Sequence, residues 1–104
     1  MPRTAGPIPT LSSKERLILE LLVEHHELYG LQLVDSSRRR LKRGTVYVTL
    51  GRMEDKGYVA VRREDAPPDA GGLPRRIYRA TPLGRRVLDV WTAVAQRLTP
   101  EVAR

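Results

Sequence analysis

Apolar residues recur at helical spacing in four separate segments of the chain. In the first segment, Leu17 and Leu21 share one helical face. Ser12 and Glu15 stand before them at capping-box spacing, at which each side chain can bond the backbone amide of the other. The pattern predicts a helix over about residues 13–26.

The same criterion indicates a short second helix and a long last helix. Leu31 and Val34 lie three residues apart and predict a helix over residues 29–36, with a glycine near its start that allows close backbone approach. Thr81 suits an N-cap, and Pro82 suits the first helical turn, where its missing N–H is not needed. The apolar stripe of the last helix comprises Leu83, Val87, Trp91, Val94 and Leu98.

The remaining helical segment, predicted over residues 44–56, has two unlike faces. At about 100° per residue, Val46, Leu50 and Met53 cluster on one side and are expected to face the core. The other residues leave a free face, with these members: Thr45, Val48, Arg52 and Asp55 broadly opposite the core, and Tyr47 and Thr49 on the two flanks.

Alternation of polar and apolar residues replaces the helical pattern after Gly57. A strand is predicted from Tyr58 and a returning strand over residues 75–80. Between them, DAPPDAGGLP has paired prolines and paired glycines, which are typical of a loop. Three helices, a β-hairpin and a fourth helix predict an α+β, mostly α fold: a winged helix-turn-helix with one C-terminal helix.

Composition adds a class of partner to this fold. The 104 residues carry a net charge of +7, which favours a polyanion: nucleic acid first, an anionic membrane second. The sequence contains no cysteine, no apolar run near the ~18 residues of a membrane span and no apolar N-terminal block typical of a signal peptide. A cytoplasmic protein is therefore expected. Its amphipathic helices have mixed polar faces and are needed for the core, so membrane binding is not expected.

A basic run, RRRLKR at residues 38–43, leads straight into the third predicted helix. A charge run is often only solvated surface, but here the helix N-terminus also favours phosphate. The free face of the helix can contact base edges in the major groove, through threonine hydroxyls, methyl groups and an arginine. The candidate DNA-binding residues are Arg40, Lys42, Arg43, Thr45, Tyr47, Val48, Thr49, Arg52, Arg75 and Arg76.

Five arginines lie on the predicted hairpin, and alternation prevents all of them from pointing the same way. We expect some to reach backbone phosphates or the minor groove, and others to pair with Glu64, Asp65 or acids of the first helix. Arg75 and Arg76, nearest the loop, are the stronger DNA candidates.

Three motifs in order make the chain resemble the PadR family of transcriptional regulators: ELYGLQLV at 27–34, GTVYVTLGRMEDKGYV at 44–59 and GLPRRIYRATPLGRRVL at 72–88. The resemblance implies a homodimeric repressor of the short subgroup, which dimerises through its single C-terminal helix together with the first helix. Such a regulator is cytoplasmic, associated with the nucleoid through DNA, and often released by a small ligand. The implied organisation is a flexible arm (1–10), a DNA-binding domain (11–81), a dimerisation helix (82–99) and a tail (100–104).

Trp91 is the only tryptophan in the sequence, and two uses of it stay open. It can pack in the core or a dimer interface, as apolar helical stripes commonly do. It can also form a ligand platform, because some drug-sensing members of the family that the chain resembles bind flat aromatic compounds between paired tryptophans. The candidate dimer or ligand residues are Leu83, Val87, Trp91, Val94 and Leu98, and the expected effector is small and hydrophobic or aromatic.

The sequence gives no support for an enzyme, a cofactor or a metal site. It holds no nucleophile–base pair or Gly-rich phosphate loop, and the adjacent His25 and His26 diverge on a helix, without a third ligand. The alternative to a DNA-binding regulator is a winged-helix module that docks a protein partner through its last helix. The strong positive charge argues against that alternative.

Overall fold

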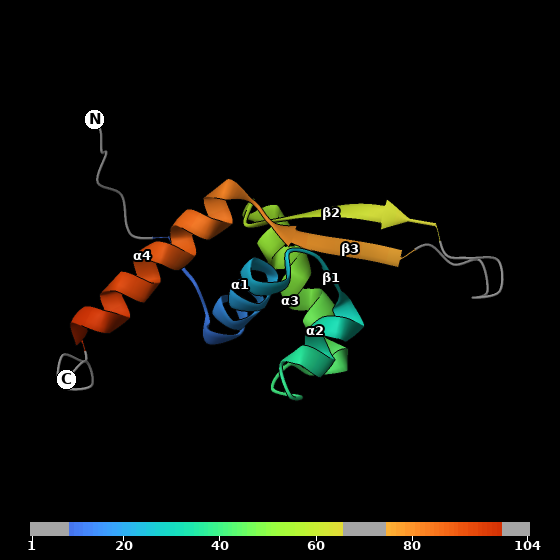
Figure 1. The fold of residues 1–104 in the computed structure, drawn as a ribbon, viewed down its shortest axis with the longest axis horizontal. Coiled ribbons are helices and arrows are strands. Elements are labelled where there is room, and N and C mark those ends of the chain that lie inside the picture. Colours follow the sequence, from blue (N-terminus) through green and yellow to red (C-terminus); the bar gives the residue numbers. More distant parts are fainter. Residues whose placement is uncertain (1–8, 66–74, 99–104) are drawn as a thin grey trace.

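The computed structural model describes residues 9–65 and 75–98. Its elements follow the predicted order (Figure 1): α1 (Ser13–His25), β1 (Leu28–Tyr29), α2 (Gly30–Ser36), α3 (Arg43–Asp55), β2 (Val59–Glu64), β3 (Arg75–Ala80) and α4 (Pro82–Leu98). Helices α1, α2 and α3 pack together beside a small antiparallel sheet. The arrangement is a winged helix-turn-helix with one further helix, as the sequence predicts.

Local signals in the sequence fix the ends of the helices. At α1 the capping box is complete, because Glu15 N donates to Ser12 Oγ at 3.1 Å and Ser12 N donates to Glu15 Oε1 at 2.8 Å. At α4, Gly84 N donates to Thr81 Oγ1 at 3.0 Å, which makes Thr81 the N-cap.

Helix α3 ends at a glycine in the left-handed region, Gly57 with φ of 81°. Gly57 N donates to Glu54 O at 3.0 Å, and Tyr58 N donates to Met53 O at 2.8 Å, so that the helix terminates in a Schellman motif. Thr81 N in turn donates to Tyr58 O at 3.0 Å, and its hydroxyl donates to Gly57 O. The end of α3, the start of β2 and the start of α4 therefore meet at one junction.

The sheet has the strand order β1-β3-β2, and both pairings are antiparallel. Strands β2 and β3 form the wing, with Val61 opposite Tyr78 and Glu64 opposite Arg75. The two residues of β1 add to the other edge of β3, where Tyr29 is opposite Ile77. This short strand connects α1 to α2 and ties the wing to the helical bundle.

The core lies between the three bundle helices, the sheet and the first half of α4. Val46, Leu50 and Met53 are each at most 1% exposed, so the predicted core face of α3 is confirmed. The other fully buried large side chains come from α1, α2 and the turn before α3, and they are Ile18, Leu19, Leu22, Leu33 and Leu41. From α4, Val87 and Leu88 complete this core.

The structure corrects several details of the sequence-based expectation. Leu31 was expected on the apolar face of α2 but is 45% exposed, because the buried face of α2 consists of Gly30, Leu33 and Val34. Tyr29 belongs to β1, which was not predicted because two residues are too few to show an alternating pattern. Tyr58 precedes β2 and does not begin it. The loop tip at residues 66–74 lies outside the described residues.

In Figure 1 the wing and the second half of α4 extend to opposite sides of the bundle, which gives the molecule an elongated shape of 51 × 39 × 22 Å. The N-terminal arm is described only for Pro9 and Thr10. Tyr58 Oη donates to Thr10 O at 2.9 Å, and these two residues therefore lie against the domain. Within the described parts, no helix is long and apolar enough to cross a membrane.

Candidate nucleic-acid interface

The free face of α3 presents apolar side chains at its centre. Val48 is 57% exposed and Tyr47 is 47% exposed, which is unusual for large apolar groups of a small domain. Thr45 is exposed and Thr49 half-buried on the neighbouring flank. Both hydroxyls bond within the helix: Thr49 Oγ1 donates to Thr45 O at 3.1 Å, and Thr45 Oγ1 donates to Lys42 O at 3.4 Å.

Tyr47 is positioned by a glycine of the neighbouring helix. Its ring lies against Gly30, the first residue of α2, so closely that a Cβ at residue 30 would stand 2.5 Å from Tyr47 Cε1. Any larger residue at this position would push the ring away. The Tyr-Gly pair at positions 29 and 30 thus determines the shape of the surface beside the free face of α3.

A buried serine shapes the turn that carries the basic run. Ser37 is 1% exposed; its hydroxyl donates to Val34 O at 2.8 Å and accepts from Leu41 N at 3.0 Å. Between these two anchors, Arg38 and Arg39 adopt left-handed φ values of 55° and 67°. Non-glycine residues seldom occupy this region, so the turn is held by its surroundings.

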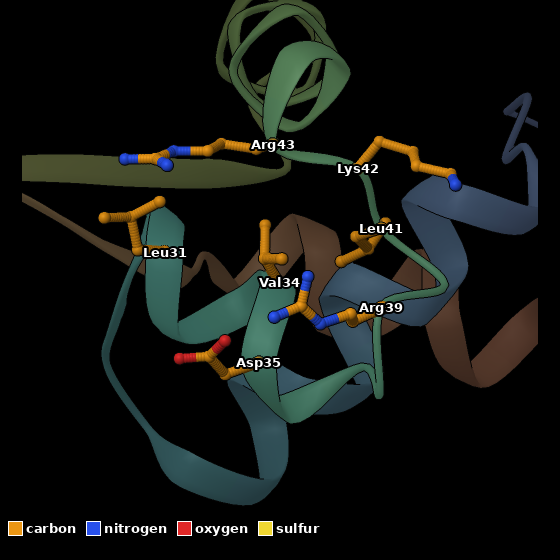
Figure 2. Close-up of a pocket in the computed structure, with 7 residues that line it drawn as sticks. All are labelled: Leu31, Val34, Asp35, Arg39, Leu41, Lys42 and Arg43. Atoms are coloured by element: carbon orange, nitrogen blue, oxygen red, sulfur yellow. The ribbon is translucent and has the colours of Figure 1, made fainter.

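The end of the turn and the start of α3 surround a pocket of about 310 Å³. Figure 2 shows its apolar floor, formed by Leu31, Val34 and Leu41, with Asp35 at one side. Three cations line it, namely Arg39, Lys42 and Arg43, and none of them forms an ion pair with another described residue. Unpaired cations at a helix N-terminus are suited to hold phosphate.

Arg40 and Arg52 lie at the edges of this region. Arg40 Nε donates to Ser37 O at 3.4 Å and its side chain lines a hollow beside α1. Arg52 is exposed one turn before the end of α3, where it lines a hollow of about 430 Å³ together with Thr10, Lys56 and Trp91. Both arginines are therefore on the α1 side of α3, opposite the side of Tyr47.

The wing arginines fall into two groups, as strand alternation predicts. Arg62 pairs with Glu27, with Nη2 to Oε1 at 2.8 Å and Nε to Oε2 at 3.0 Å. Arg62 Nη1 also lies 3.9 Å from Glu64 Oε2, so the expected pairing with Glu64 is confirmed, whereas Glu27 lies just after α1 and not within it. Arg76 is exposed and has no ion-pair partner in the described part of the chain.

Arg75 packs on Tyr29 at the end of the wing where β3 begins. Its guanidinium carbon lies 5.0 Å from the centre of the ring, and Nη1 donates to the Tyr29 hydroxyl at 3.3 Å. The same hydroxyl donates to Glu64 Oε1 at 2.8 Å. Tyr29 therefore connects all three strands and places a wing cation close to the N-terminus of α2.

Two carboxyl groups are held in their charged form by basic partners. Burial opposes ionisation of Glu15, but hydrogen bonds from Ser12 and Lys56 outweigh it and leave the pKa of Glu15 below its ordinary value. The hydrogen bonds from Arg62 lower the pKa of Glu27, and the same contact raises the pKa of Arg62. Lys56 and Arg62 are thus engaged within the protein and less available to a partner.

The apolar stripe of α4 divides into a buried and an accessible part. Val87 is only 3% exposed and belongs to the core of the chain itself, whereas Leu83 is 39% exposed and Trp91 and Val94 are half-buried. Val90, which was not among the predicted residues, is 44% exposed. The predicted residue Leu98 lies outside the described side chains.

An apolar hollow of about 250 Å³ lies on this helix. Leu83, Val90 and Trp91 line it together with Pro9 and Arg86. Trp91 Nε1 donates to Pro9 O at 2.8 Å, so the indole N–H is satisfied by the arm and not by the core.

Sequence reasoning missed three residues that build this surface: Tyr29, Ser37 and Val90. Val90 follows Leu83 by seven residues, or two helical turns, and this spacing could have placed Val90 on the same face of α4. Tyr29 and Ser37 act through contacts with residues distant in space or in an irregular turn, which no periodic pattern reveals.

A bundle in helix-turn-helix order, a hairpin wing and an amphipathic last helix define the winged-helix class of transcriptional regulators. The chain belongs to the family described as the transcriptional regulator PadR-like family, whose profile matches residues 18–90. It is 33% identical over 95 residues to transcriptional regulator Rv3488 of Mycobacterium tuberculosis, with 85% of each chain covered.

Solved structures agree with this assignment. A PadR family regulator from Eggerthella lenta is 31% identical, with a TM-score of 0.70 over 85% of this chain and 76% of that one. Another from Clostridium difficile is 28% identical, with a TM-score of 0.68 over 88% of this chain and 94% of that one. The protein is thus a transcriptional regulator and not an enzyme.

Proposed function

We propose that the protein is a homodimeric repressor that places α3 of each subunit in the major groove of a pseudo-palindromic operator. The observation that carries this proposal is the position of the cations Arg39, Lys42 and Arg43 at the N-terminal end of the free α3 face, where no acid of residues 9–65 and 75–98 pairs with them. A two-fold dimer would place two such helices about one helical turn of DNA apart.

The wing gives this arrangement a second contact with the DNA backbone. Arg75 and Arg76 are exposed at the end of the wing beside the loop, and Arg75 is held in place by Tyr29. Phosphate contacts of this kind orient a protein on DNA, while α3 supplies the contacts to bases.

The proposal is tested by fluorescence anisotropy with labelled duplex DNA at increasing salt concentration. Each phosphate contact contributes about one unit to the slope of log affinity against log salt, so Arg43→Ala should reduce the slope by about 1. Arg62→Ala is the matched control, since Arg62 is already paired with Glu27. Binding without salt dependence, or an unchanged slope in Arg43→Ala and Arg52→Ala together, contradicts the proposal.

The accessible face of α4 is the proposed site of dimerisation and of effector binding. Leu83, Val90 and Trp91 offer apolar surface, and the hollow that they line fits a small hydrophobic or aromatic effector. Binding there would release DNA if it changed the angle between the two subunits. Because Trp91 is the only tryptophan, its fluorescence reports binding directly, and an unchanged emission spectrum during a titration that releases DNA contradicts this site.

A further inference from the structure

The centre of the proposed DNA-facing surface is apolar and its rim is positively charged. Leu31, Tyr47 and Val48 are among the exposed large apolar residues, at 45%, 47% and 57% exposure. They lie on adjacent elements, because the ring of Tyr47 contacts the residue that precedes Leu31. We call these three residues the apolar patch. Its rim carries Arg39, Lys42 and Arg43, which share a pocket with Leu31.

The polar groups beside the patch are largely engaged within the helix. The hydroxyl protons of Thr45 and Thr49 are donated to backbone carbonyls of the preceding turn. A threonine that bonds back in this way leaves its methyl group as the outward-facing part of the side chain. Methyl groups therefore dominate the middle of the free α3 face.

The major groove of A·T-rich DNA has the complementary distribution. Thymine places its C5-methyl group on the floor of the groove, and the phosphates run along both rims. A protein partner with an acidic rim could also pair with the cations. The methyl-bearing face of α3, however, is one helix wide, and the major groove admits one helix, which favours DNA as the partner.

We propose that Val48 contacts the C5-methyl group of a thymine in each operator half-site and is the main specificity-determining residue of α3. This inference rests on the proposed function, since it requires α3 to enter the major groove. It assigns discrimination to apolar contact with thymine, and leaves the arginines of the rim to bind phosphate without regard to sequence.

The test begins with duplexes selected by the intact protein from a random library. Thymines of the selected half-site are then replaced one at a time by deoxyuridine, which removes the methyl group and keeps every base-pairing group. One replacement in each half-site should weaken binding by about 10- to 100-fold, because the dimer loses two buried methyl contacts and each contributes about 3- to 10-fold. Deoxyuridine at thymines outside the half-sites serves as the control on the DNA side.

Val48→Ala completes a double-mutant cycle. The substitution lies on an exposed helical position, so circular dichroism should show an unchanged fold. The variant should bind the thymine duplex as weakly as the wild type binds the deoxyuridine duplex, and it should not distinguish the two. Equal binding of both duplexes by the wild type, or an equal penalty in both proteins, overturns the assignment.

The outcomes separate this inference from the function on which it rests. If the protein binds no duplex at all, both fail. If it binds selected duplexes with the expected salt dependence but ignores deoxyuridine, the repressor proposal stands and the role of Val48 is wrong.

Discussion

At the scale of single residues, the surface of α3 depends on residues that lie beside it and are not among the proposed DNA contacts. Gly30 gives the ring of Tyr47 its place, and Lys56 neutralises Glu15 at a distance of 2.9 Å between Nζ and Oε2. Each of these residues acts through a steric or electrostatic contact inside the chain. Substituting these residues should therefore change either the free energy of unfolding or the affinity for DNA, and not both to the same extent.

Gly30→Ala should weaken DNA binding with little loss of stability. The added Cβ displaces the exposed Tyr47 ring, which can swing into solvent, while alanine is the better helix former by about 0.5–1 kcal/mol. Anisotropy and thermal unfolding measure the two effects. In a Tyr47→Leu background the same change should do no further harm; an additive loss would contradict a role through Tyr47.

Glu15→Gln should destabilise the protein by about 1–2 kcal/mol at pH 7, because a charge-assisted bond to buried Glu15 is lost. Since the pKa of Glu15 is lowered from 4.5 in the folded state, its contribution is complete above that value and is lost as the pH falls through the lowered pKa. The wild type and the variant should therefore converge in free energy of unfolding on acidification, as measured by urea titrations.

The exposed pair Arg16–Glu20 provides the matched control on the same helix. Glu20→Gln should change stability by well under about 1 kcal/mol, because exposed pairs contribute little. A constant difference between wild type and Glu15→Gln at every pH would show that the charge of Glu15 is irrelevant.

At the scale of elements, the sequence predicts what is periodic or capped. The helices, their caps at Ser12 and Thr81 and the buried face of α3 follow from spacing and side-chain chemistry. Contacts between elements do not: the strand at Tyr29 is too short for a pattern, and the choice of Glu27 as partner of Arg62 depends on how α1 ends beside the wing. The exposure of Leu31 likewise depends on which face of α2 packs against the core.

Gly84→Ala should destabilise the junction between β2 and α4 by about 1–3 kcal/mol. A Cβ on Gly84 would overlap the backbone oxygen of Tyr58, which cannot rotate away as a side chain can. Thermal unfolding measures the loss. Gly51→Ala is the matched control, because a Cβ there meets nothing within 4 Å and should raise stability. Equal stability of the two variants would contradict close packing at Gly84.

At the scale of the whole molecule, the described chain has two working ends. The cationic turn and the wing form the proposed DNA surface, and the accessible stripe of α4 forms the proposed subunit contact. Val87 is 3% exposed and belongs mainly to the core, although it also lines the hollow on α4. No residue of α4 lines the pocket at the start of α3, so a subunit contact through α4 would leave that pocket uncovered.

Val90→Glu should convert a dimer into the 11.8 kDa monomer and lower operator affinity steeply, because a charge would be buried in the subunit contact. Sedimentation or light scattering gives the mass. Arg85→Ala changes the net charge equally on the opposite side of α4 and should remain dimeric. A wild-type protein that is monomeric at micromolar concentration would contradict the proposed interface.

The junction at Gly57, Tyr58 and Thr81 has a mechanical consequence. Two hydrogen bonds from Thr81 and the close approach of Gly84 to Tyr58 join the end of α3 to the start of α4. In a dimer joined through α4, a small rotation at the subunit contact would move α4 and α3 together as one rigid body. The distance between the two α3 helices, and not their internal shape, would then be the quantity that an effector changes.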